Sequence, residues 1–333
     1  MKNGVIELVK TDKGAVMPAN TEFCGAVWRC PVCGGIIRRA RGREIAEGLE
    51  RWIAAGHGAV FITVTVRHQL GDPLAQLIDL MGDAWRRTVR GEPWKRIKQR
   101  TGWIGYTRTL EITYGHDANG WHPHYHFLAY LDKPANEQVA AYLQSQITER
   151  FSKFLAKAGA VAHLPDAVHG VDVRPVAANG AIGSLGKYVS KMASEMSAGD
   201  IKHGRLPAHL SPFQLLDITS KPWAVAAWRE YVEATKGKRS IYYSRGMRDL
   251  LGLGDEKDDD AIIDEETQVE AEAVGAVSSD VWADVEASDA WHALDRALVA
   301  AARGDWVAAA SELGVALGCM IDTDTGQQLP LLL

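Results

Sequence analysis

Apolar and polar positions follow two periods along the first part of the chain, and they predict most of the regular structure. Residues 59–67 alternate and are rich in β-branched side chains, which is typical of a strand. Residues 73–90 repeat apolar positions at helical spacing, which predicts an amphipathic helix that continues through a basic helical patch around Trp94–Arg100. By the same reasoning we expect strands at 103–114, 121–131 and 169–176 and helices at 136–157 and 180–197.

The order of these elements is β-α-β-β-α-β-α, which predicts an α+β fold with a mostly antiparallel central sheet flanked by helices. The sequence GHDANG is rich in turn formers and separates the strands at 103–114 and 121–131, so these two strands form a hairpin. Asn136 is a suitable N-cap for the helix that follows.

Four segments are expected. They are an N-terminal segment at 1–50 with a possible zinc knuckle, the main α+β domain at 51–250, an acidic linker at 251–280 and an Ala-rich helical tail at 281–333. No long apolar window and no secretory signal are present, so we expect a cytoplasmic protein without membrane contact.

Charge divides the chain of 333 residues into two parts. Residues 1–250 carry 34 Lys and Arg against 23 Asp and Glu, whereas residues 251–333 carry 3 against 19. A basic body with an acidic tail is typical of a nucleic-acid-binding protein. The alternative is an ordinary solvated surface with an acidic solubilising tail.

Three histidines, His122, His124 and His126, alternate along the second strand of the hairpin and therefore point to one face. If Tyr114 pairs with Trp121, Glu111 lies directly opposite His124. A carboxylate and two imidazoles then converge and form a divalent-cation site with open positions. A one-residue slip in register would remove Glu111 from this face. A closed structural zinc site is a further reading.

Two other segments carry candidate chemistry. In the helix at 180–197, Tyr188 lies between Lys187 and Lys191, and a phenol beside an ammonium group is a candidate nucleophile or a core residue. Cys24, Cys30 and Cys33 have knuckle-like spacing, which indicates zinc ligands or reduced structural thiols. Nothing in the spacing selects His57 or His68 as the fourth ligand.

The segments FITVTVRH, HPHYHFLAYL and GKYVSK, in this order, resemble the three motifs of HUH-type rolling-circle replication initiators (Rep proteins) of actinobacterial plasmids and integrative elements. The resemblance covers about residues 22–255. It implies an enzyme that nicks one DNA strand at an origin through a 5′-phosphotyrosyl intermediate. It also implies a nicking-site Mg²⁺ or Mn²⁺, with origin DNA, a host helicase and a polymerase as partners, and the oligomeric state stays open.

By this resemblance His124 and His126 are the metal histidines, with Glu111 as their acidic partner and His122 ranked third. Tyr188 matches the nucleophile and Lys191 the lysine that follows it. Arginines beside the cysteines and one lysine of the third motif are expected to contact DNA, namely Arg38, Arg39, Arg41 and Lys187. Candidates for stacking on bases are Trp28, Trp94, Trp103, Trp121, Tyr242 and Tyr243, and the alternative for most of the tryptophans is a place in the core.

One position departs from the family pattern. Some relatives carry a glutamate four residues before the nucleophile, where this chain has Ser184. In those relatives the glutamate is thought to help water release the enzyme when replication terminates. Here either termination proceeds differently or another acid takes this role. The competing functions are a relaxase or single-tyrosine transposase, a metal-stabilised DNA-binding regulator without activity, and an unrelated metallohydrolase. The nucleophile follows the histidines in the chain, which disfavours the relaxase.

Overall fold

The computed structural model describes residues 5–11, 16–19, 23–166, 170–176, 210–267, 271–288, 291–317, 320–321 and 328–329. The chain divides into two compact units. We call Gly25–Ile262 the sheet unit, and we call Met1–Cys24 together with Ile263–Leu333 the terminal unit. Each is described by itself.

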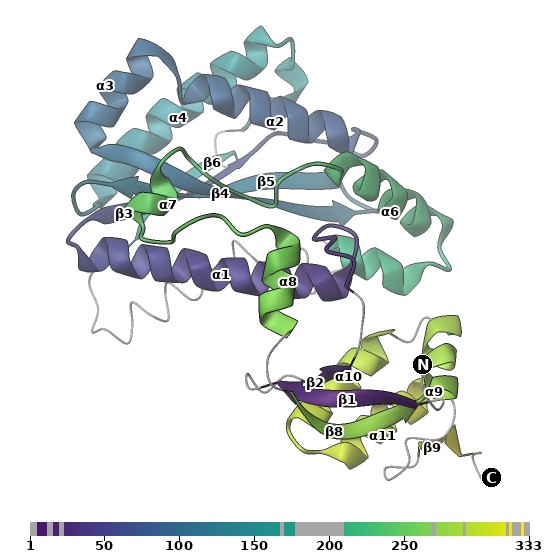
Figure 1. Ribbon diagram of the computed structural model, residues 1–333. Helices are drawn as coiled ribbons and strands as arrows, with labels where there is room; N and C mark the ends of the chain where they lie inside the picture. Colours follow the sequence, from purple (N-terminus) through teal and green to yellow (C-terminus); the bar gives the residue numbers. More distant parts are fainter. Residues whose placement is uncertain are drawn as a thin grey trace. The chain divides into compact units, whose positions relative to one another are not determined.

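The sheet unit is an α+β structure, as expected (Figure 1). Its helices are α1 (Pro31–Ala54), α2 (Leu74–Thr88), α3 (Gly91–Thr101), α4 (Glu137–Lys157), α6 (Pro222–Thr235) and α7 (Met247–Leu250), with 3₁₀ turns η1 (Val161–His163) and η2 (Pro212–Ile218). Its strands are β3 (Gly58–Thr65), β4 (Trp103–Gly115), β5 (Gly120–Leu131), β6 (Val171–Pro175) and β7 (Ile241–Tyr243). Helix α8 (Asp259–Thr267) contains the boundary between the two units.

The central sheet has five strands in the order β6-β3-β5-β4-β7, and all neighbours are antiparallel. This confirms the predicted antiparallel sheet and the β4–β5 hairpin. Asn136 also caps α4, because its side chain accepts a hydrogen bond from the Val139 backbone N–H at 2.9 Å. The expected helix at 180–197 lies outside the described residues.

Helices cover both faces of this sheet (Figure 1). On one face, Leu128 and Tyr130 of β5 pack in a core with Ile45 and Leu49 of α1. On the other face, where α2, α3 and α4 lie, Phe127 stacks on Trp85 of α2 with ring centroids 3.9 Å apart. The alternation of β5 thus assigns the two faces to different helices.

Helix α1 was not predicted from the sequence. Its residues include several glycines, which weaken helix propensity. Ile37, Ile45, Leu49 and Trp52 are nevertheless buried along it. Packing of this stripe against the sheet therefore stabilises a helix that local preference alone does not indicate.

The terminal unit joins both ends of the described chain. Strands β1 (Val5–Thr11), β2 (Val16–Pro18) and β8 (Ala271–Ser278) form a sheet in the order β2-β1-β8. The segment expected as a helical tail contains α9 (Ser279–Ala287), α10 (Trp291–Ala302) and α11 (Trp306–Leu317), and β9 (Met320–Ile321) pairs with β10 (Gln328–Leu329).

The segment expected to be an acidic linker differs from that expectation. It contains α8 and β8, and β8 pairs along its length with β1 from the opposite end of the sequence. The helices pack on this sheet through Val281, Val285 and Leu294. The acidic composition gave no sign of β8 because its pairing partner lies more than 250 residues away.

Candidate metal centre and nucleic-acid site

The hairpin register decides which side chains meet at the centre of the sheet. Tyr114 pairs with Trp121, Glu111 with His124, and Thr109 with His126. This confirms the register predicted from the turn. Glu111 and the two histidines therefore project from neighbouring strands toward the same face of the sheet.

One carboxylate oxygen lies between the two imidazoles. Glu111 Oε2 is 2.9 Å from His124 Nε2 and 2.7 Å from His126 Nε2. Burial by itself raises the pKa of Glu111, but the hydrogen bonds and positive charge of His124 and His126 hold this pKa far below its usual range. The carboxylate is therefore ionised at neutral pH.

The residues present fit a divalent cation. One donor atom from each of Glu111, His124 and His126 lies within 4.8 Å of the others. Two imidazole nitrogens and a carboxylate oxygen form a set that binds Mn²⁺, Mg²⁺ or Zn²⁺ and leaves coordination positions for substrate oxygens. Glu111 alone does not form this ligand set, because the two nitrogen donors come from His124 and His126 on β5.

Strand β3 supplies contacts that sequence reasoning missed. Thr63 pairs with His126 across β3 and β5, and its hydroxyl lies 3.1 Å from His126 Nδ1. The ring of Phe61 stacks on the same imidazole at 5.2 Å between centroids. A hydrogen bond at Nδ1 orients a metal-binding histidine and leaves its Nε2 lone pair available. The signal in the sequence was the alternation of FITVT, which places Phe61 and Thr63 on one face.

His122 differs from the other two histidines. Its Nδ1 lies 2.5 Å from Nε2 of His68, whose Nδ1 is in turn 3.0 Å from the Asn119 carbonyl oxygen. The cluster of mutually close ligand atoms among the described residues contains His124 and His126 but not His122. The extended loop after β3 thus gives His122 a different partner, which the strand pattern alone did not reveal.

The three cysteines come together as expected. Their sulfur atoms lie within 4.8 Å of one another, and the Cys33 backbone N–H donates to Cys30 Sγ at 3.4 Å at the start of α1. Within the described ranges the cluster includes no fourth histidine, cysteine or carboxylate. His57 stacks on Trp52 and His68 contacts His122, so neither of these two candidates completes the triad.

Several expected DNA-contacting groups are placed differently from the prediction. Arg38 and Arg41 are buried, with exposed fractions of 4% and 6%. Arg41 donates to the Lys257 carbonyl and to Glu44, and Arg38 lies over the Trp28 ring. These guanidinium groups hold α1 in place, whereas Arg39 is exposed.

The expected base-stacking residues are mostly core residues. Their rings fill the interior, as shown by the buried side chains of Trp28, Trp94, Trp103, Trp121 and Tyr243. Tyr242 is partly exposed and lies beside Arg108 and Tyr106. Lys187, Tyr188 and Lys191 lie outside the described residues.

Comparison with known proteins identifies the family. Residues 16–289 match a family described as "Replication protein". The chain belongs to this replication protein family. It is 30% identical to "Protein rep" of Streptomyces lividans, over 88% of this chain and 76% of that protein. The expected resemblance to Rep initiators is therefore confirmed.

Two other relatives match shorter stretches of the chain. "Protein rep" of a Bacillus species is 32% identical over 35% of this chain and 36% of its own length. "Neomycin resistance protein" of Streptomyces cyanogenus is 35% identical over 37% of this chain and 33% of its own. No solved structure matches significantly. In the described part of the chain, no helix has the length and apolar character needed to cross a membrane.

Proposed function

We propose that this replication protein is a HUH-type endonuclease that nicks and rejoins one strand of origin DNA to start rolling-circle replication of a plasmid or related element. The observation that carries the proposal is the convergence of Glu111 Oε2 on the Nε2 atoms of His124 and His126. Its support from sequence is the order of the three motifs, in which GKYVSK follows HPHYH.

In this proposal Glu111, His124 and His126 hold Mg²⁺ or Mn²⁺. Such a cation polarises a phosphate and stabilises the charge that develops on it. Thr63 and Phe61 keep the His126 ring oriented. The Tyr188 phenol gives up its proton as its oxygen attacks the phosphorus atom, the bond from phosphorus to the 3′ oxygen breaks, and the leaving oxygen takes up one proton as a 3′-hydroxyl, so the numbers of protons lost and gained are equal. Lys191 stabilises the phenolate.

Two other tyrosines near the histidine face are poorly suited to act as the nucleophile. Tyr130 and Tyr243 belong to the buried core that includes Leu128. Burial raises the pKa of both phenols. Tyr130 is also hydrogen-bonded to Thr107 at 3.1 Å. These observations support the assignment of the nucleophile to the third motif.

The test is metal-dependent nicking of single-stranded oligonucleotides tiled across the DNA around the protein's own gene. We expect a covalent protein–DNA adduct that Tyr188→Phe loses and that Tyr142→Phe, a control in α4, retains. His124→Ala should lose nicking while keeping the wild-type circular dichroism spectrum. Full adduct formation by Tyr188→Phe would reject the nucleophile. DNA binding without any nicking would favour the non-enzymatic regulator.

A further inference from the structure

The corner where α2 passes into α3 carries a one-sided run of charge. Between positions 86 and 100 the chain has seven lysines and arginines and one acid, Glu92. The acid pairs within α3 with Lys95 at 2.5 Å. At the end of α2, Arg86 pairs with Asp83. Ordinary solvated helices interleave both signs of charge, and this corner does not.

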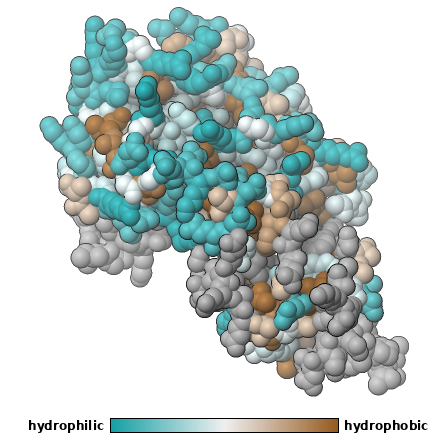
Figure 2. Space-filling view, viewed as in Figure 1, coloured by the Kyte–Doolittle hydropathy of each residue, from teal (hydrophilic) through white to brown (hydrophobic). Residues whose placement is uncertain are grey.

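Three of these cations are free to meet a partner. Arg87, Arg90 and Arg96 are exposed, and none of them forms an ion pair with another described residue. The outward-facing side of α3 is mainly hydrophilic in Figure 2. The inward side is anchored by Trp94 and Ile97, which are buried. The helix therefore presents its charges outward on a packed support.

The corner is also fixed in shape. Arg150 of α4 donates to the carbonyl oxygens of Thr88 at 2.7 Å and of Arg90 at 2.8 Å. Near the other end of α3, the guanidinium group of Arg100 lies 4.1 Å from the centroid of the Tyr142 ring. These contacts hold α3 against α4, so little ordering is needed when a ligand binds.

Helix α1 has a similar number of arginines but does not present the same surface. Two of its arginines, Arg38 and Arg41, are buried, and a third, Arg51, pairs with Glu47. Helix α6 has two acids and one arginine. The α2–α3 corner thus differs from α1 in that Arg87, Arg90 and Arg96 are exposed without an ion pair among the described residues, and from α6 in that a single acid accompanies its cations.

We propose that the α2–α3 corner is a second DNA contact that binds the phosphate backbone of duplex DNA, apart from the nicking site. Helix α3 has 11 residues and is about 16 Å long, and B-DNA carries one charge per roughly 1.7 Å of axis. A corner whose three unpaired cations, Arg87, Arg90 and Arg96, flank and follow the start of this helix matches this dense, regular charge better than it matches a single strand.

The location separates this contact from the metal cluster. Helix α2 packs on the face of β5 that carries Phe127, whereas His124 and His126 point to the opposite face. The sheet therefore lies between the duplex contact and the histidines. The protein would hold double-stranded DNA on one side while a melted strand reaches the other.

The test measures binding of the full chain to a fluorescein-labelled random-sequence 20-base-pair duplex, in EDTA, over a range of salt concentrations. The variant combines Arg87→Gln, Arg90→Gln and Arg96→Gln. We expect the slope of log affinity against log salt to become shallower by about 2–3, with affinity at low salt reduced about tenfold or more.

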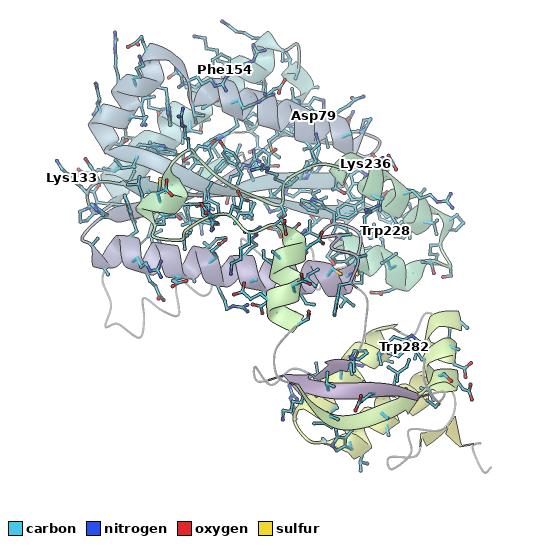
Figure 3. The ribbon with its side chains drawn as sticks, in the orientation of Figure 1. Asp79, Lys133, Phe154, Trp228, Lys236 and Trp282 are labelled. Atoms are coloured by element: carbon cyan, nitrogen blue, oxygen red, sulfur yellow. The ribbon has the colours of Figure 1, made fainter. Side chains whose placement is uncertain are left out.

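The matched control removes three exposed cations from α6 and its flanks, through Lys221→Gln, Arg229→Gln and Lys236→Gln. Lys236 is labelled in Figure 3. The control should keep the wild-type slope and affinity. Equal loss in both variants, or no loss in the α2–α3 variant, would overturn the proposal. The assignment to duplex DNA would also be overturned if the α2–α3 variant lost as much affinity for a single strand of the same length as it loses for the duplex.

Metal-free binding does not depend on nicking, so this experiment succeeds or fails independently of the proposed endonuclease. Circular dichroism spectra of both variants verify that they are folded. If nicking also exists, the α2–α3 variant should cut a short single-stranded oligonucleotide at the wild-type rate. A rate that falls in parallel with duplex affinity would contradict two separate contacts.

Discussion

At the scale of single residues, position within the β4–β5 hairpin separates histidines that look alike in the sequence. His124 and His126 share one carboxylate oxygen of Glu111, whereas His122 lies against His68. All three alternate on one strand and point to the same side. The difference arises because His124 and His126 contact Glu111 of β4, whereas His122 contacts His68 of the loop after β3.

This difference predicts distinct effects on metal binding. His124→Asn should weaken Mn²⁺ binding by at least about tenfold, because it removes a donor from the cluster. His122→Asn should leave the affinity within about threefold of wild type, because His122 is outside that cluster. Isothermal titration calorimetry at neutral pH measures both. If both variants lost a comparable amount of Mn²⁺ affinity, His122 would have to be counted among the metal ligands.

Acid should weaken the same metal binding. Imidazole nitrogens bind metal only when they are deprotonated, and a free histidine has a pKa of about 6.5. The pKa of Glu111 is held far below its usual range, so this carboxylate stays ionised and a loss of affinity in acid reports protons that compete with the metal for imidazole nitrogens. Mn²⁺ affinity should therefore fall as pH drops from about 7 to 5. A constant affinity over this interval would contradict histidine ligation.

At the scale of elements, a partly buried ionic network joins α1 to α7, the helix after β7. Glu44 of α1 accepts a hydrogen bond from Arg248 at 2.7 Å and one from Arg41 at 3.4 Å. Burial raises the pKa of Glu44, but the two guanidinium groups outweigh this effect and lower it. The ionised carboxylate therefore stabilises the position of α1, which covers the face that carries the metal cluster.

The network gives a pH-dependent prediction. Glu44→Gln should lower the free energy of unfolding by about 1–3 kcal/mol at neutral pH, because Arg248 and Arg41 lose a charged acceptor. A lowered folded-state pKa means that the stabilisation is present above the unfolded-state value and is lost as pH falls through the folded-state value. The difference between variant and wild type should thus shrink below about pH 4 in urea unfolding curves. A difference that is independent of pH would contradict the ionised pairing.

At the scale of the whole molecule, the chain forms two units that each have a core. Leu49 is fully buried in the sheet unit, in the core between α1 and the sheet. Leu294 is buried among the helices and strands of the terminal unit. Because the terminal unit is assembled from both ends of the chain, the sheet unit is an insertion between β2 and the middle of α8.

Separate cores predict separate cooperative transitions. Leu49→Ala and Leu294→Ala should each cost about 2–5 kcal/mol, but in different units. Differential scanning calorimetry should show two transitions, with each variant lowering the midpoint of only one of them. If both variants shift a single common transition, the two cores unfold as one unit.

The sequence by itself determined the antiparallel sheet, the hairpin register and the meeting of Glu111 with His124 and His126. These depend on local periodicity and on a short turn, so nearby residues contain the information. The tertiary structure alone decided that Arg38 and Arg41 are buried, that His122 contacts His68, and that β8 pairs with β1. The contacts of Arg41 with Lys257, of His122 with His68 and of β8 with β1 join segments distant in sequence, and side-chain pattern does not specify which distant partner is brought near.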